Sequence, residues 1–178
     1  MEAHDLDRDV ASIAAIASSN DWRRMPELLV DACESLVPAD SSLLAVFGDT
    51  AKPSCIYHDV PLDQQCKNID AYLEGNYLLD PYYRAGIERV ASGVYPLDEL
   101  APPGFNRSDY FQRYYKDAGI GDEIGIIVHL PDDCFAILSL ATEAGSAEFS
   151  PADIRRLEEH LPDIEAVIVA YWNKLRSA

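Results

Sequence analysis

The strongest structural signal in this chain is the stretch EIGIIVHL at residues 123–130, followed by PDD at 131–133 and CFAILSLAT at 134–142. Its two outer parts are rich in Ile, Val, Leu and Phe, which favour β-strands because their side chains pack well on a pleated surface. Pro followed by two Asp residues is typical of a tight turn. The stretch therefore predicts a β-hairpin.

Weaker signals on both sides extend this hairpin into a sheet with helices. Residues 42–47 and 54–60 predict a second hairpin, and residues 93–97 predict a brief strand. Helical spacing of apolar residues, Pro at first turns and polar caps predict helices over residues 5–19, 21–36, 68–77, 81–90, 108–116 and 150–175. This order predicts an α+β fold, an α/β/α sandwich with a largely antiparallel central sheet flanked by helices.

The composition is that of one acidic domain without an anchor. A length of 178 residues suits a single domain over residues 1–178. The chain has no apolar run of about 18 residues and no apolar leader, so we expect a cytoplasmic protein with no membrane partner. Its formal net charge of −17 repels phosphates. We therefore expect contact with DNA only through another domain.

Cysteine and histidine spacing indicates neither a metal site nor a catalytic centre. The four cysteines, Cys33, Cys55, Cys66 and Cys134, form no Cys-x-x-Cys motif, and none adjoins a histidine. We expect reduced, mostly buried thiols, no metal, no cofactor and no catalytic residues. Thiol redox chemistry shared by Cys55, Cys66 and Cys134 stays open as an alternative function.

Tyrosines are concentrated in one part of the chain. Eight of the ten fall between Tyr72 and Tyr115, around the segment YLLDPYY at residues 77–83. Rings that each carry one hydroxyl, gathered around the carboxylate of Asp80, suit a pocket for a small amphipathic molecule. A Tyr-rich core or partner surface accounts for the same pattern, and Asp80 before Pro81 also suits a helix N-cap.

Three stretches resemble a known family: YLEGNYLLDP at 72–81, YFQRYYKDAGI at 110–120 with GIIVHLP at 125–131, and FAILSL at 135–140. They resemble the N-terminal ligand-binding, or autoinducer-binding, domain of LuxR-type transcriptional regulators. That resemblance covers about a third of the chain and implies a GAF/PAS-like sensor domain. It also implies that the helix-turn-helix DNA-binding domain of such regulators is absent from this chain.

The resemblance also implies roles for individual residues. Asp80 would accept a hydrogen bond from a ligand amide, aromatic Tyr72 and Tyr95 would hold the ligand head, and Ser139 would be the small hydroxyl residue of the late strand. Tyr77 and Tyr57 are further aromatic candidates.

The family's acyl-homoserine lactone readers carry a Trp upstream of the acid, in the region where Lys67 stands here. An acyl-homoserine lactone is therefore one candidate ligand and not the favoured one.

The function that we expect first is a small-molecule sensor that controls an attached DNA-binding domain and is not itself an enzyme. The long helix at residues 150–175 would form a homodimer, so that ligand binding changes how paired DNA-binding domains are held. Two alternatives stay open. One is a free-standing GAF-type domain with thiol redox activity, and the other is a Tyr-rich protein-interaction module.

Overall fold

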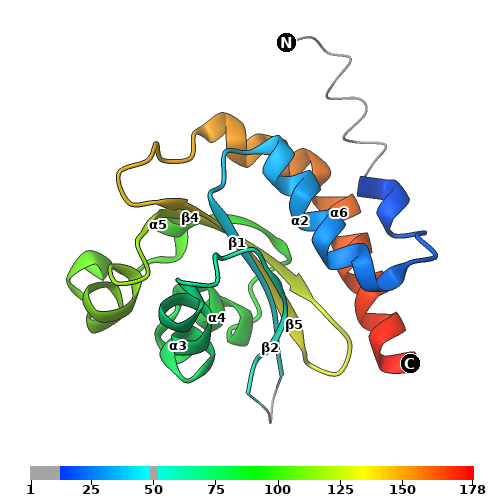
Figure 1. Cartoon of the computed structure of the whole chain (residues 1–178), viewed down its shortest axis with the longest axis horizontal. Helices are drawn as coiled ribbons and strands as arrows, with labels where there is room; N and C mark the ends of the chain where they lie inside the picture. Colours follow the sequence, from blue (N-terminus) through cyan, green and yellow to red (C-terminus); the bar gives the residue numbers. More distant parts are fainter. Residues whose placement is uncertain (1–12, 49–51) are drawn as a thin grey trace. The chain divides into compact units, whose positions relative to one another are not determined.

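Five strands form one antiparallel sheet in the part of the chain that this computed structural model describes, residues 13–48 and 52–178 (Figure 1). The strands are β1 (Ser41–Phe47), β2 (Ser54–His58), β3 (Gly93–Pro96), β4 (Ile120–His129) and β5 (Phe135–Glu143), in the order β2-β1-β5-β4-β3. The sheet belongs to one compact unit, residues 39–149, while residues 1–38 and 150–178 form another.

The predicted hairpin of residues 123–142 is confirmed as strands β4 and β5. Its turn contains Asp132 and Asp133, whose φ angles of 60° and 57° fall in the left-handed region. Asp tolerates that conformation better than most residues because its short polar side chain bonds locally. Strand β5 also pairs with β1, which in turn pairs with β2, so the second predicted hairpin is confirmed as well.

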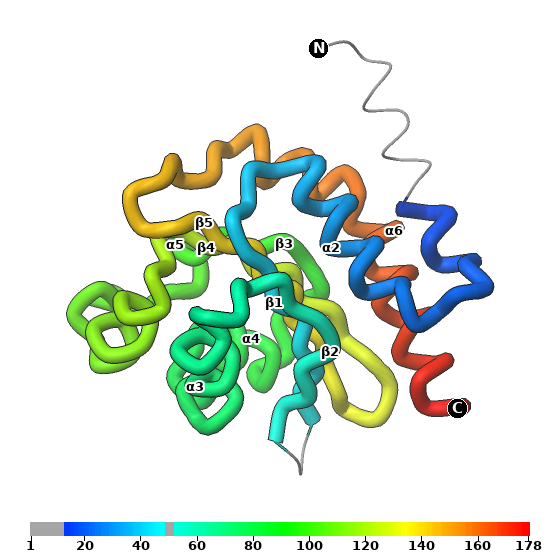
Figure 2. The backbone as a smooth tube through the Cα atoms, in the orientation of Figure 1, coloured from blue at the N-terminus to red at the C-terminus, as the bar shows by residue number. Residues whose placement is uncertain are grey.

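Short helical segments of the same unit connect β2 to β3 and β3 to β4, as the backbone trace shows (Figure 2). They comprise α3 (Ala71–Leu73), α4 (Pro81–Ile87) and α5 (Leu97–Leu100), with π-helical turns at Cys66–Asp70 and Phe111–Tyr115 and 3-10 turns at Asn76–Leu79 and Phe105–Arg107. The continuous helix predicted over residues 68–77 is wrong. Gly75 interrupts it with a φ of 154°, a conformation that side chains rarely adopt.

One face of the sheet packs against these short helices through aromatic rings. The buried cluster comprises Ala45, Phe47, Tyr72, Tyr82, Ala85, Tyr110, Tyr114, Tyr115, Ala118, Ile127, Phe135 and Ile137. Tyr82 is fully buried, and its hydroxyl lies 3.0 Å from the Glu123 carbonyl oxygen and 3.1 Å from that of Tyr95. Its ring packs against Gly125, where a Cβ atom would come within 2.3 Å of it.

We expect Gly125→Ala to destabilise the fold, because the new methyl group would push the buried Tyr82 ring away from β4. Overpacking of this kind costs about 1–3 kcal/mol. Urea unfolding of the variant and the parent measures the difference. Gly145→Ala is unsuitable as a control because Gly145 has a φ of 95°. Ala144→Gly, at an exposed loop residue, is the better comparison. An unchanged midpoint for Gly125→Ala would show that the ring is free to move.

The other unit contains the helices α2 (Met25–Leu36) and α6 (Pro151–Ser177), which lie side by side (Figure 1). Helix α6 begins with a capping box, in which the Ser150 side chain accepts from the Asp153 backbone N–H and the Asp153 carboxylate accepts from that of Ser150. It continues through Pro162. The rings of Trp22 and Tyr171 pack 5.7 Å apart. The helices predicted over residues 21–36 and 150–175 are therefore confirmed.

The helix predicted over residues 5–19 lies mostly outside the described residues, although residues 13–16 are helical. None of the helices in the described part of the chain combines the length and apolar character needed to span a bilayer. The predicted α+β class, with an antiparallel sheet and helices, is confirmed.

Candidate ligand-binding site

A cavity of about 50 Å³ lies inside the sheet unit, between three strands and the short helices. Its walls come from β1, β4 and β5 on one side, and from the π-helical turns and α3 on the other. The lining residues are Ser41, Ser42, Leu43, Val60, Asn68, Ile69, Tyr72, Tyr110, Tyr114, Ile120, Glu123, Ser139 and Ala141. The cavity thus combines aromatic rings with a small number of polar groups, as small-molecule sites do.

Strand register brings the polar groups of the sheet to this cavity. Ser139 pairs with Leu43 on one side and with Gly125 on the other. Residues that pair across antiparallel strands project from the same face, and side chains alternate along each strand. Glu123, two residues from Gly125, therefore projects from the same face as Ser139.

Tyr72 and Asp80 form a buried hydrogen-bonded pair beside the cavity. The Tyr72 hydroxyl donates to Asp80 Oδ2 over 2.5 Å. The Tyr82 backbone N–H donates to Asp80 Oδ1 over 2.9 Å, so Asp80 is the N-cap of α4. Only 4% of the Asp80 surface is exposed. Burial raises its pKa to about 6, and the two hydrogen bonds counteract that rise.

Glu123 is a second buried carboxyl, and unlike Asp80 it is one of the residues that line the cavity. Burial and, after it, the charge of Asp80 raise its pKa to about 8, although hydrogen bonding by the Ser139 and Tyr115 hydroxyls counteracts part of this rise. None of the ion pairs between described residues involves either carboxyl. At neutral pH it is therefore Glu123, with the higher pKa of the two, that holds a proton.

The surrounding tyrosines remain hydroxyl donors under ordinary conditions. Burial is the largest cause that raises the pKa of Tyr72, Tyr110 and Tyr114, and the charges of Asp80 and Glu123 add to it. The Tyr114 hydroxyl donates to the Asn68 carbonyl over 3.1 Å. The Tyr115 hydroxyl, 1% exposed, lies beside the Glu123 carboxyl without a hydrogen bond of good geometry to any described residue.

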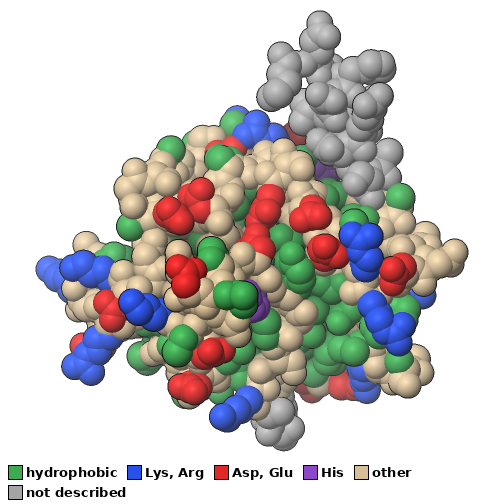
Figure 3. Space-filling view, in the orientation of Figure 1, with side chains coloured by type: hydrophobic (Ala, Val, Ile, Leu, Met, Phe, Trp, Pro, Cys, Tyr) green, Lys and Arg blue, Asp and Glu red, His purple; other side chains and the backbone are tan. Residues whose placement is uncertain are grey.

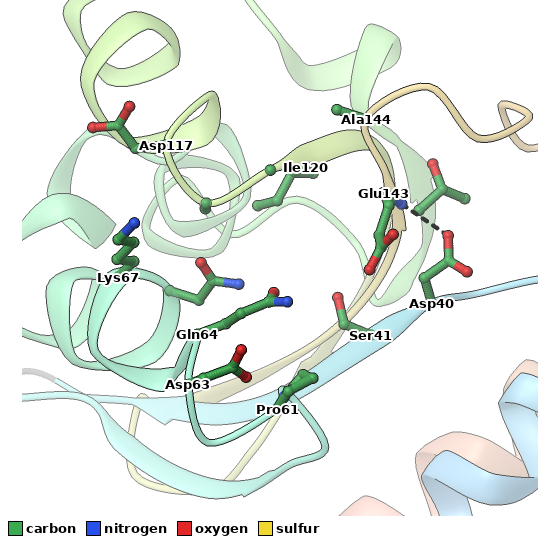
Figure 4. Close-up of a pocket in the computed structure, with 14 residues that line it drawn as sticks. Asp40, Ser41, Pro61, Asp63, Gln64, Lys67, Asp117, Ile120, Glu143 and Ala144 are labelled. Atoms are coloured by element: carbon green, nitrogen blue, oxygen red, sulfur yellow. Dashed lines mark hydrogen bonds between the residues drawn. The ribbon is translucent and has the colours of Figure 1, made fainter.

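A wider cleft of about 480 Å³ adjoins the cavity, and both are lined by Ser41, Asn68 and Ile120 (Figure 4). Its polar side chains carry mainly negative charge. The carboxylates are those of Asp40, Asp63, Asp117 and Glu143, and the single cation among its lining residues is Lys67. Figure 4 shows Glu143 and Asp40 along one wall, Asp63 and Gln64 along a second, and Asp117 with Lys67 opposite the first.

Of the six residues predicted for the site, the structure brings three together at the cavity. Tyr72 and Ser139 line it, and Asp80 lies behind the Tyr72 hydroxyl. Tyr77 packs on the Tyr72 ring with centroids 6.3 Å apart, so it supports this cluster from outside the lining.

Tyr95 and Tyr57 lie away from the cavity lining. Tyr95 is on the edge strand β3, and its hydroxyl donates to the Ala91 carbonyl over 2.8 Å. Tyr57 pairs with Leu44, so it projects from the opposite face of the sheet to Ser139. A register shift between Leu44 and Ala45 determines from which face of the sheet each β2 side chain projects. No residue pattern marks that irregularity.

Sequence reasoning missed Glu123, Tyr114 and Asn68 as lining residues. A Glu at the start of an apolar strand predicts a solvent-exposed strand end, because charged residues are almost never fully buried. The one available signal was the period of two along β4, which places Glu123 on the same face as Gly125.

The described residues contain no group of three or more His, Cys, Asp or Glu that could hold a metal ion. The four cysteines are free thiols. Burial raises the pKa of Cys33 to about 12, and it also raises the pKa of Cys55. Thiolates, the reactive form, are therefore disfavoured at both positions. Asp and Glu side chains are scattered, together with Lys and Arg, over the face in Figure 3.

The fold is that of GAF-like sensor domains, including the ligand-binding domains of LuxR-type regulators. Four GAF domains of known structure match with TM-scores from 0.57 to 0.61. No protein-family model matches the sequence. No curated protein sequence matches it.

Three similar structures come from LuxR-type proteins. The VqsR ligand-binding domain from Pseudomonas aeruginosa has a TM-score of 0.77 at 21% identity, over 92% of this chain and 94% of that one. SdiA in complex with octanoyl-rac-glycerol has a TM-score of 0.69 at 14% identity, over 98% and 69%. CepR2 from Burkholderia cenocepacia, an N-acylhomoserine lactone dependent LuxR family transcription factor, has a TM-score of 0.64 at 12% identity, over 94% and 98%.

Proposed function

We propose that this chain is the small-molecule-sensing domain of a LuxR-type bacterial transcriptional regulator. It binds an amphipathic ligand in the Tyr-lined cavity and controls a fused DNA-binding domain. The observation that carries this proposal is the cavity between Ser139, Tyr72 and Glu123, in a fold shared with LuxR-type ligand-binding domains. SdiA with octanoyl-rac-glycerol and lactone-dependent CepR2 show that this fold accommodates small amphipathic ligands.

The size of the cavity sets how a ligand would fit. At about 50 Å³ the cavity is small beside the adjoining cleft, so it would take only the polar head group of a ligand. The remainder of the ligand would occupy the adjoining cleft of about 480 Å³. For a ligand N–H to reach Asp80, the hydrogen bond from the Tyr72 hydroxyl to the Asp80 carboxylate would have to break.

We expect Ser139→Leu to abolish binding of mono-octanoylglycerol, because the larger side chain fills the head-group cavity. Native mass spectrometry of the parent should give a 1:1 complex. Ser146→Leu, which adds the same side chain at an exposed position, is the matched control and should keep the complex. Equal binding by parent and Ser139→Leu would place the ligand elsewhere.

The regulatory part of the proposal depends on a DNA-binding domain, because a strongly acidic chain does not bind DNA phosphates well by itself. Reading the source locus beyond the codon for Ala178 tests it. About 60–80 further residues with a basic helix-turn-helix pattern are expected. A stop codon at that point would contradict the fused arrangement. The homodimer and the cytoplasmic location belong to the same proposal.

A further inference from the structure

Glu123 is a buried carboxyl that takes no part in the hydrogen bonds that hold Asp80. Asp80 already has two hydrogen-bond donors, Tyr72 and the Tyr82 backbone, and it caps α4. The hydrogen-bonding groups beside the Glu123 carboxyl are the Ser139 and Tyr115 hydroxyls. Glu123 lines the cavity and is 8% exposed. A buried carboxyl without a cation is costly to ionise, so a cationic partner in the cavity would stabilise its charged form.

The Tyr115 hydroxyl, which lies beside Glu123 and outside the cavity lining, lacks a well-formed hydrogen bond to any described residue. It is almost completely buried, and it makes no hydrogen bond of good geometry to the described residues even though the Glu123 carboxyl lies beside it. Buried hydroxyls rarely stay unsatisfied in folded proteins. An ammonium group has no acceptor for the Tyr115 O–H, so Tyr115, which lies outside the cavity lining, is left to support the Glu123 carboxylate beside it.

The cleft that adjoins this cavity is negatively charged, as is an ionised Glu123 carboxylate. The adjoining cleft has four carboxylates and one lysine among its lining residues. Clefts lined by one sign of charge concentrate ligands of the opposite sign and repel those of the same sign. The cleft therefore favours a cation and disfavours a carboxylate or a phosphate.

We propose that Glu123 determines ligand specificity in this cavity, and that the ligand is an organic cation whose primary ammonium group binds the Glu123 carboxylate. This inference rests on the proposed sensor function and names the class of its ligand. An ammonium group has three donors and is compact enough for a cavity of about 50 Å³. Glu123 accepts one of them, and the Ser139 hydroxyl accepts another.

The test compares three probes of equal chain length: hexylamine, hexanol and hexanoate. Isothermal titration calorimetry with the parent should give the tightest binding for hexylamine, with hexanoate weakest. Glu123→Gln should weaken hexylamine binding about tenfold or more, since a charge-assisted bond is replaced by a neutral one. Glu148→Gln removes one charge at an exposed position and should leave hexylamine binding unchanged.

Two results would overturn the inference. One is hexanol binding as tightly as hexylamine, and the other is hexylamine binding Glu123→Gln as tightly as the parent. If mono-octanoylglycerol binds in a Ser139-dependent way while hexylamine does not bind, the sensor function stands and the cation specificity fails. If neither probe binds, both fail. Circular dichroism and the urea midpoint of Glu123→Gln confirm that the variant is folded.

Discussion

Glu123→Gln is expected to remove a large fall in stability that the parent shows between about pH 5 and pH 8. The pKa of Glu123 is raised to about 8 in the folded protein, from 4.5 in the unfolded chain. In that window the folded state holds a proton that the unfolded state has lost. Stability from this group is therefore fully present below pH 4.5 and is lost as the pH rises through about 8.

The shift from 4.5 to about 8 corresponds to a full loss of about 5 kcal/mol, since each pKa unit is worth ~1.4 kcal/mol. The groups that face Glu123 are the carboxyls of Asp80 and Asp122 and the hydroxyls of Ser139 and Tyr115. Asp80, with a pKa raised to about 6, contributes a smaller fall that ends at lower pH and stays in the variant.

Urea unfolding at several pH values measures this difference between the parent and Glu123→Gln. The whole-molecule charge of −17 adds its own repulsion as the pH rises. Glu148→Gln, which removes one exposed charge, is the control for that general effect. Parallel stability curves for the parent and Glu123→Gln would mean that the Glu123 carboxyl is hydrated and not buried in a cavity.

Asp80→Ala is expected to lower the free energy of unfolding by about 2–4 kcal/mol, because it removes an N-cap and leaves a buried hydroxyl without a hydrogen-bond partner. The cap is the hydrogen bond from the Tyr82 backbone N–H, and the group that loses its partner is the Tyr72 hydroxyl. Tyr72→Phe alone should cost about 1–2 kcal/mol. The double variant should lose less stability than the sum of the two single variants, by about 1 kcal/mol or more, because Phe at position 72 has no hydroxyl that needs a partner.

Urea unfolding of the two single variants and the double variant gives the coupling energy. Tyr95→Phe removes a hydroxyl that bonds the Ala91 carbonyl at an exposed position, and it should change stability by less than ~0.5 kcal/mol. Strictly additive costs for Asp80→Ala and Tyr72→Phe would show that the 2.5 Å bond between them makes no contribution of its own.

The sheet and the two long helices could be predicted because their signals are local. Strands β4 and β5 are dense in β-branched and aliphatic residues, and Ser150 with Pro151 marks the start of α6. Local signals also placed Asp80 correctly as an N-cap. The break at Gly75 escaped prediction because a single glycine inside a helical pattern is usually tolerated.

The contents of the cavity could be predicted only in part. Tyr72 and Ser139 came from the family resemblance, whereas burial of Glu123 depends on which helices pack over β4. The facing of Tyr57 depends on an irregularity in the pairing of β1 and β2, which no residue pattern marks. Properties that depend on contacts between distant segments were therefore the ones that sequence reasoning missed.

The central claim is that the cavity at Glu123, Ser139 and Tyr72 is a ligand site. Nitrogen-15 amide NMR spectra of the chain, titrated with hexylamine and separately with mono-octanoylglycerol, test it most directly. We expect saturable shift changes that are largest at the amides of Glu123, Ser139 and Tyr114, which line the cavity. No change with either probe, or changes confined to exposed residues such as Leu62 and Ile87, would contradict it.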